Sequence, residues 1–202
     1  MAGPASTAQE GVAPMDTALH RKAKAGRAEH QARAMSLAKA LRLTLAKIAE
    51  EKFEMSMAAI GLRSQKCAGE KIDQELRDTE HLLLSDGTGR SRDAVMMDSL
   101  FVGALIQQQT MGKVLAAPDG ADRPMTPTDA AIAAPFLDEV LNSAAPMLED
   151  SEEQKLIAGF RFGAWVEDVR VLAMSLDAPN YHLVHIDVDI SGGVRQGRIV
   201  LC

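Results

Sequence analysis

The sequence has few aromatic residues, few cysteines and no long apolar run. Aromatic residues make up 3% of the 202-residue chain, and the two cysteines, Cys67 and Cys202, lie far apart. No run approaches the roughly 18 apolar residues of a membrane-spanning helix, and the N-terminus lacks the apolar core of a signal peptide. These absences argue against a disulfide framework and a transmembrane span, and they favour a cytoplasmic protein with reduced thiols.

The composition that is present is that of a globular protein. Hydrophobic residues make up 47% of the chain and charged residues 25%, which is ordinary for a domain with a buried core. The 11 methionines outnumber the seven aromatic residues (five Phe, one Tyr and one Trp). We therefore expect an aliphatic core in which methionine fills irregular gaps.

Charge is distributed unevenly along the chain. Residues 1–52 carry nine Lys/Arg and five Asp/Glu, a balance of +4, whereas the remainder carries 13 and 23, a balance of −10. Residues 1–15 are rich in Ala, Gly, Pro and Ser, which predicts disorder. Residues 16–52 are alanine-rich and free of proline, which predicts a basic helical arm whose second half docks on the body. The acidic body, residues 53–202, is a poor nucleic-acid binder.

The last stretch, Tyr181 to Cys202, predicts a β-hairpin. Apolar residues alternate with polar ones from Val184 to Ile190, as on a half-buried strand. Ser191-Gly192-Gly193 then supplies a turn, and the second strand closes on Ile199–Cys202. This strand stops without a polar tail, so we expect the chain to be part of a longer protein whose C-terminal domain is absent here.

The middle of the chain predicts alternating strands and helices. A second hairpin joins Leu82–Leu84 to Ala94–Met96 through Asp86–Gly89. Further strands are expected at 53–63 and 160–169, with short helices at 70–76 and 169–176. A helix follows Asp98 as its N-cap, and 112–123 is an exposed loop.

A long helix is predicted after Thr126. Thr126 is the N-cap, Pro127 occupies the first turn, and Asp129 complements the helix N-terminus. The spacing predicts that Ile132, Phe136, Val140 and Ala144 are buried, and Pro135 predicts a kink. Hairpins separated by helices indicate an α/β (α+β) domain with a largely antiparallel sheet that helices cover.

Few residues form a pattern that carries chemistry. His182, His185, Asp187 and Asp189 can bind metals, but they are best interpreted as the solvated face of a strand. Cys67 is interpreted as an isolated thiol. Glu139 and Asn142 lie three apart, so they share a helix face on which a water can be positioned. We therefore expect a protein without catalytic activity, cofactor or metal.

Four stretches of residues 30–202 resemble the FliM family of flagellar motor switch proteins, in its middle domain. They are AEHQARAMSLAKALRLTLAKIA, HLLLSDGTGRSRDAVMMDSLFVGALIQQQTMGKV, RPMTPTDAAIAAPFLDEVLN and YHLVHIDVDISGGVRQGRIVL. Arg195, Gly197 and Leu201 match the family's final strand, and Thr126-Pro127-Thr128-Asp129 matches the start of its long helix. The resemblance implies the pseudo-symmetric fold that FliM shares with the CheC phosphatases.

The resemblance also implies a role, a place and partners. It implies a scaffold in the cytoplasmic ring of the flagellar basal body, at the face of the inner membrane, which links chemotaxis to the direction of rotation. The implied partners are the rotor protein FliG, neighbouring FliM copies and FliN. The glycine loop that meets FliG corresponds to Thr110, Met111, Gly112 and Lys113, of which only Gly112 keeps the family's GGxG pattern.

Two further features bear on partners and activity. The family's acidic peptide that captures phosphorylated CheY does not stand at this basic N-terminus, so we do not expect CheY capture there. The CheC phosphatases carry an ExxN pair on a helix of the fold, and Glu139 and Asn142 match it once. The alternative function is thus a CheC-like phosphatase of a phosphorylated response regulator that uses Glu139 and Asn142.

Overall fold

The computed structural model describes residues 35–76, 81–87, 92–117, 124–149 and 151–202, with no account of the side chains of 81–84. Met35–Cys202 forms one compact unit. The predicted disorder of 1–15 and the predicted arm up to residue 34 lie outside the described residues. So do residues 88–89 of the turn predicted at Asp86–Gly89 and residues 118–123 of the predicted loop.

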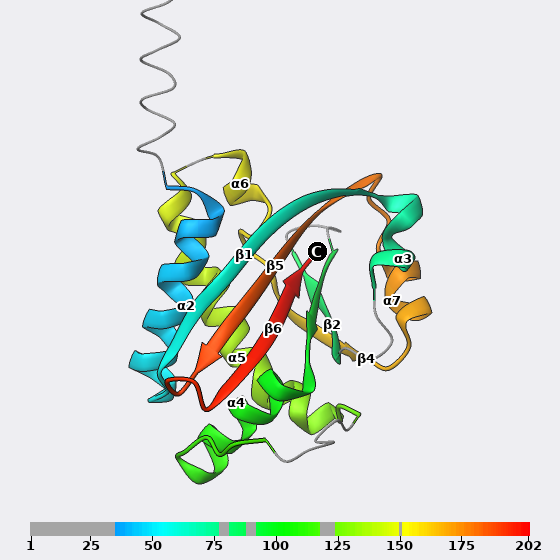
Figure 1. The fold of residues 1–202 in the computed structure, drawn as a ribbon. Helices are drawn as coiled ribbons and strands as arrows, with labels where there is room; N and C mark the ends of the chain where they lie inside the picture. The colour runs from blue at the N-terminus through cyan, green and yellow to red at the C-terminus, as the bar shows by residue number, and fades with distance from the viewer. Residues whose placement is uncertain (1–34, 77–80, 88–91, 118–123, 150) are drawn as a thin grey trace, which may run out of the picture. The chain divides into compact units, whose positions relative to one another are not determined.

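The centre of the unit is a six-stranded sheet in the order β1-β5-β6-β3-β2-β4 (Figure 1). Every neighbouring pair of strands is antiparallel. The strands are β1 (Met57–Ala68), β2 (His81–Asp86), β3 (Arg92–Met97), β4 (Arg161–Val166), β5 (Asn180–Ile190) and β6 (Arg195–Leu201). Both predicted hairpins, β2–β3 and β5–β6, are confirmed, and so is the fold class.

The terminal hairpin forms for the reason that its sequence suggests. Val184, Ile186, Val188 and Ile190 are buried, and the residues between them are half-buried. The turn takes positive φ at Ser191, Gly192 and Gly193, with values of 55°, 65° and 92°. Only glycine adopts such angles without steric cost, so the glycine pair permits the tight return of the chain.

In the described residues, eight helical segments precede or connect the strands. They are α2 (Leu37–Phe53), η1 (Gly69–Lys71), α3 (Ile72–Glu75), α4 (Ser99–Met111), α5 (Pro127–Ala144), η2 (Ala145–Leu148), α6 (Glu152–Lys155) and α7 (Val169–Ser175). The predicted caps are present: Asp98 accepts from the Phe101 amide, and Thr126 with Asp129 forms a capping box. Such caps satisfy amides that the first helical turn leaves unpaired.

The two faces of the sheet carry separate apolar clusters. One face of β5 and β6 packs with α2, α4 and α5 around Phe101 and Phe136, whose ring centroids are 5.9 Å apart. The other face packs with α3 and α7 around Leu172 and Leu183. Helix α2 therefore belongs to the compact unit, which starts at Met35 and includes this part of the predicted arm.

The first strand differs from its prediction. Residues 53–63 were expected to be extended, but α2 runs to Phe53 and ends at Glu54, whose φ of 51° is left-handed. Strand β1 then runs from Met57 to Ala68, and its register with β5 shifts between Ala59 and Gly61. This bulge breaks the alternation of side chains, which is why the sequence pattern there is loose.

The long helix α5 differs in its buried face. Phe136, Val140 and Ala144 are buried as predicted, but Ile132 is only half-buried because Ala133 turns toward the core instead. The helix continues across Pro135, which is exposed. Ala131, whose carbonyl loses its usual donor to the proline, is exposed too, so water can satisfy that carbonyl.

Candidate functional site

The predicted partner-binding residues lie at the end of α4. The helix continues through Thr110 and Met111, so half of the expected loop is the last helical turn. Gly112 ends the helix with a φ of 69°, and its amide donates to the Gln108 carbonyl at 2.9 Å. All four predicted residues are exposed, and 52% of Met111 is open to solvent.

The segment after Gly112 is held against α4 and β6. The Leu115 amide donates to Gln107 Oε1 at 3.0 Å, and the Leu115 carbonyl accepts from Arg195 Nε at 2.8 Å. Arg195 Nη2 donates to the same Gln107 Oε1 at 3.0 Å. Hydrogen bonds therefore hold residues 112–115 at both ends, and Lys113 is exposed between them.

Exposed apolar side chains surround this segment. Met111, Leu115, Leu100 and Val194 are each more than a third exposed. The carbonyls of Leu100 and Leu115 both accept from the guanidinium of Arg195, and Val194 precedes Arg195 in the chain. We call the exposed surface made by Leu100, Thr110, Met111, Lys113, Leu115 and Val194 the α4-end surface. Exposed apolar side chains on a fixed backbone, beside a charge such as that of Lys113, are typical of a surface that binds another protein.

The predicted acid and amide pair lies on α5. Glu139 faces α2, where Lys52 Nζ lies 2.5 Å from Glu139 Oε2. Asn142 is exposed. The carboxylate that the alternative function needs is thus engaged in an ion pair.

The metal-capable residues of β5 have other partners. Asp187 Oδ1 accepts from Arg198 Nε at 2.8 Å, Asp189 Oδ2 accepts from the Gly193 amide at 3.0 Å, and His182 hydrogen-bonds Ser64. Within the described residues, no three His, Cys, Asp or Glu side chains are grouped as a metal would need.

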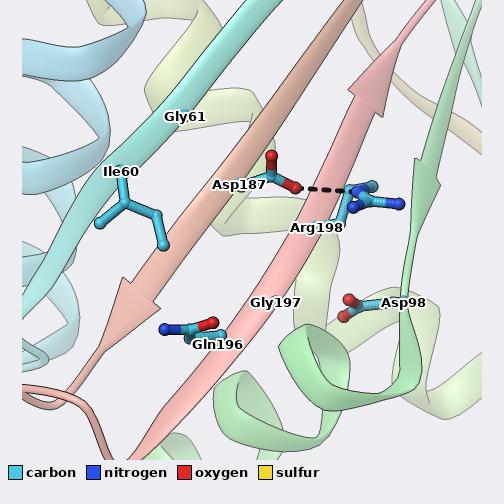
Figure 2. Close-up of a pocket in the computed structure, with 7 residues that line it drawn as sticks. All are labelled: Ile60, Gly61, Asp98, Asp187, Gln196, Gly197 and Arg198. Atoms are coloured by element: carbon cyan, nitrogen blue, oxygen red, sulfur yellow. Dashed lines mark hydrogen bonds and ion pairs between the residues drawn. The ribbon is translucent and has the colours of Figure 1, made fainter.

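An open hollow of about 380 Å³ lies on the sheet beside these residues. Figure 2 shows the Asp187–Arg198 pair in it, with Asp98 nearby at the start of α4. Burial raises the pKa of Asp98 above its ordinary value, although the hydrogen bond from the Phe101 amide opposes this rise. The lining has two carboxylates and one guanidinium: Asp187 pairs with Arg198, and Asp98 accepts from the Phe101 amide as the cap of α4.

The two thiols are buried and free. Burial is the largest cause that raises the pKa of Cys67, and it also raises that of Cys202. Because the thiolate is the nucleophile, both groups are poor nucleophiles at neutral pH. Cys67 is not isolated as the sequence suggested, because Cys202 belongs to the same apolar cluster and Cys67 contributes to its raised pKa.

Sequence reasoning named part of the α4-end surface. It named Thr110–Lys113 from a family resemblance, but it missed Gln107 and Leu115. It noted Arg195 only as a match to the family's final strand. The contacts of Arg195 reach 80 to 95 residues away along the chain, and no local pattern signals such distances.

The architecture is an α/β (α+β) domain, in which helices cover a six-stranded antiparallel sheet. No family model matches the chain, and no curated protein matches it. Among solved structures, FliM in the FliG–FliM complex of H. pylori is 10% identical, with a TM-score of 0.60 and coverage of 82% of this chain and 87% of that one. FliM in the FliM–SpeE complex of H. pylori is 8% identical, with a TM-score of 0.57 and coverage of 90% and 87%.

A third solved structure is similar. The FliM middle domain of Vibrio alginolyticus is 13% identical, with a TM-score of 0.54 and coverage of 82% of this chain and 89% of that one. At these identities the likeness shows a shared fold. In the part of the chain that the structure describes, no helix has the length and apolarity to cross a membrane.

Proposed function

We propose that this chain is a non-catalytic scaffold of the flagellar motor switch, which binds a FliG-type rotor protein. The observation that carries the proposal is the fold, which the chain shares with FliM middle domains, one of them solved in a complex with FliG. The fold alone does not fix a function, so the binding surface must be argued from this chain's own residues.

The α4-end surface is the proposed contact with the rotor protein. Met111 offers a flexible apolar side chain with little to pack against, since half of it is exposed. Gly112 leaves open space beside the backbone, because a Cβ there would meet no atom within 4 Å. Lys113 supplies a charge that a partner can pair at the rim. Binding energy concentrates in a few such residues.

Neighbouring FliM-type copies and FliN are the further partners that this role implies. The place that the role implies is the cytoplasmic face of the inner membrane, in the flagellar basal body. Capture of phosphorylated CheY is not part of the proposal.

Substitution of Met111 tests the contact. We expect Met111→Lys to raise the Kd for FliG of the same organism at least tenfold, or about 1.4 kcal/mol. Lysine suits the last turn of a helix, where the carbonyl ends favour a cation, so the melting temperature should stay nearly unchanged. Titration of labelled FliG measures the effect. Gly112 is a poorer target, because its left-handed φ of 69° makes any side chain cost about 1–2 kcal/mol of stability.

The matched control is Met174→Lys. Met174 is also an exposed methionine on a helix, 86% open to solvent, but it lies on α7. The control should bind FliG as the wild type does. If Met111→Lys also binds like the wild type, the contact lies elsewhere or the partner is another protein.

The absence of catalysis is the second part of the proposal, and the phosphatase alternative is its competitor. Glu139 is engaged by Lys52, and Asn142 is exposed. We expect no acceleration of the dephosphorylation of a response regulator by the wild-type chain, or by Lys52→Met, which frees Glu139. An acceleration that Glu139→Ala with Asn142→Ala abolishes would overturn this part of the proposal.

A further inference from the structure

We propose that Arg195 is the positioning residue of the α4-end surface: its guanidinium fixes the backbone that presents Met111, Lys113 and Leu115 to a partner. That this surface binds a partner rests on the proposed function. That Arg195 fixes the backbone does not, and it can be measured on the chain alone.

The contacts of Arg195 join three separate segments. Its Nε donates to the Leu115 carbonyl at 2.8 Å, its Nη2 to Gln107 Oε1 at 3.0 Å, and its Nη1 to the Leu100 carbonyl at 3.4 Å. One planar group thus connects β6 with the start of α4, the middle of α4 and the segment after it. Only arginine has this fork of donors, because lysine has a single head group.

Gln107 completes the arrangement. Its Oε1 accepts from both Arg195 Nη2 and the Leu115 amide, so one side-chain oxygen lies between the guanidinium and the backbone of the segment. The amide and the carbonyl of Leu115 are therefore both satisfied by the same pair of side chains. At the other end, the Gly112 amide is fixed to the Gln108 carbonyl.

Two glycines make room for the arginine and for the strand that carries it. A Cβ on Gly103 of α4 would lie 3.0 Å from Arg195 Nη1. A Cβ on Gly197 of β6 would lie 2.8 Å from Phe101 Cβ and 3.0 Å from its Cα. Helix and strand thus approach closely at both positions: a methyl group at Gly103 would press on Arg195 Nη1, and one at Gly197 would press on Phe101.

Burying the charge of Arg195 costs free energy, which simple packing of its side chain does not explain. Arg195 is 7% exposed, and this burial lowers the pKa of its guanidinium. The acceptors that it reaches in the described residues are two carbonyl oxygens and one amide oxygen, and each is a neutral group. Arg195 thus fixes the backbone at Leu100 and Leu115 and the side chain of Gln107. A segment that is ordered beforehand loses less entropy when a partner binds.

The test measures the backbone and the binding separately. In Arg195→Gln and in Gln107→Ala, the Leu115 amide should exchange with solvent at least tenfold faster in native-state hydrogen exchange, while the amides of α5 keep their rates. The Kd for FliG should rise at least tenfold in both. Gln107→Ala leaves the buried arginine in place, so the test survives if Arg195→Gln fails to fold.

Arg198→Gln is the matched control. Arg198 lies on the same strand, half-buried, and its ion pair with Asp187 lies on the opposite face. This variant should leave both the Leu115 exchange rate and the binding unchanged.

Each result decides one claim. Unchanged exchange of Leu115 in both variants would overturn the positioning role. Faster exchange with unchanged FliG binding would overturn the link between this segment and the partner. If the wild type itself does not bind FliG, the proposed function fails, and the exchange rates alone decide the role of Arg195.

Discussion

The two faces of the sheet are covered very differently. On one face α2, α4 and α5, which have 17, 13 and 18 residues, form a continuous core with the sheet. On the other face α3 and α7 have four and seven residues, and their cluster is smaller. Helices this short have little stability by themselves. The long-helix face therefore holds the unit together, and the short-helix face depends on it.

Removal of an aromatic ring from the long-helix face should have the largest effect on stability. Phe136 is fully buried and contacts the rings of both Phe53 and Phe101. We expect Phe136→Ala to lower the free energy of unfolding by about 3–5 kcal/mol, measured by urea denaturation. Ile132→Ala is the control on the same helix and should cost about half as much or less, because Ile132 is half-buried. Equal costs would contradict the assigned buried face of α5.

A substitution on the short-helix face tests whether this face unfolds before the other. Leu172 on α7 is fully buried, yet its neighbours include few residues from long helices. We expect Leu172→Ala to cost about 2–3 kcal/mol and to speed amide exchange in α7 before exchange in α2 and α5 changes. Uniform acceleration across all helices would show instead that the two faces unfold as one unit.

The smallest expected effect concerns pH and Asp98, which lies where α4 joins the sheet. Its pKa is raised in the folded protein by burial, so the folded state binds more protons than the unfolded one between the two pKa values. Ionisation of Asp98 therefore costs stability, which should increase as the pH falls through its folded pKa toward its unfolded pKa. Asparagine keeps the cap acceptor, so Asp98→Asn should be at least as stable at pH 7 and should lose this increase.

Thermal melts at a series of pH values between 4 and 7 give the comparison for Asp98. The difference in stability between the variant and the wild type should shrink as the pH falls. A difference that grows toward low pH would mean that the charged carboxylate stabilises the fold, and the assigned sign would be wrong.

Much of the fold was predictable because its signals are local. The alternation from Val184 to Ile190, the glycine pair after it and the caps at Asp98 and Thr126 each depend on residues a few positions apart. Helix caps and tight turns are decided by backbone groups within one turn of the chain. The sequence by itself therefore determined the terminal hairpin, the long helix and the antiparallel character of the sheet.

Tertiary structure decided what depends on distant partners. The start of β1 and its bulge follow from pairing with β5, about 120 residues away, and Ile132 loses its place in the core to Ala133 because of how α5 meets its neighbours. Lys52 reaches Glu139, and Arg195 reaches Gln107 and Leu115, across comparable separations. The free energy of such contacts comes from burial and from hydrogen bonds that form only when the chain closes on itself, so no local pattern carries them.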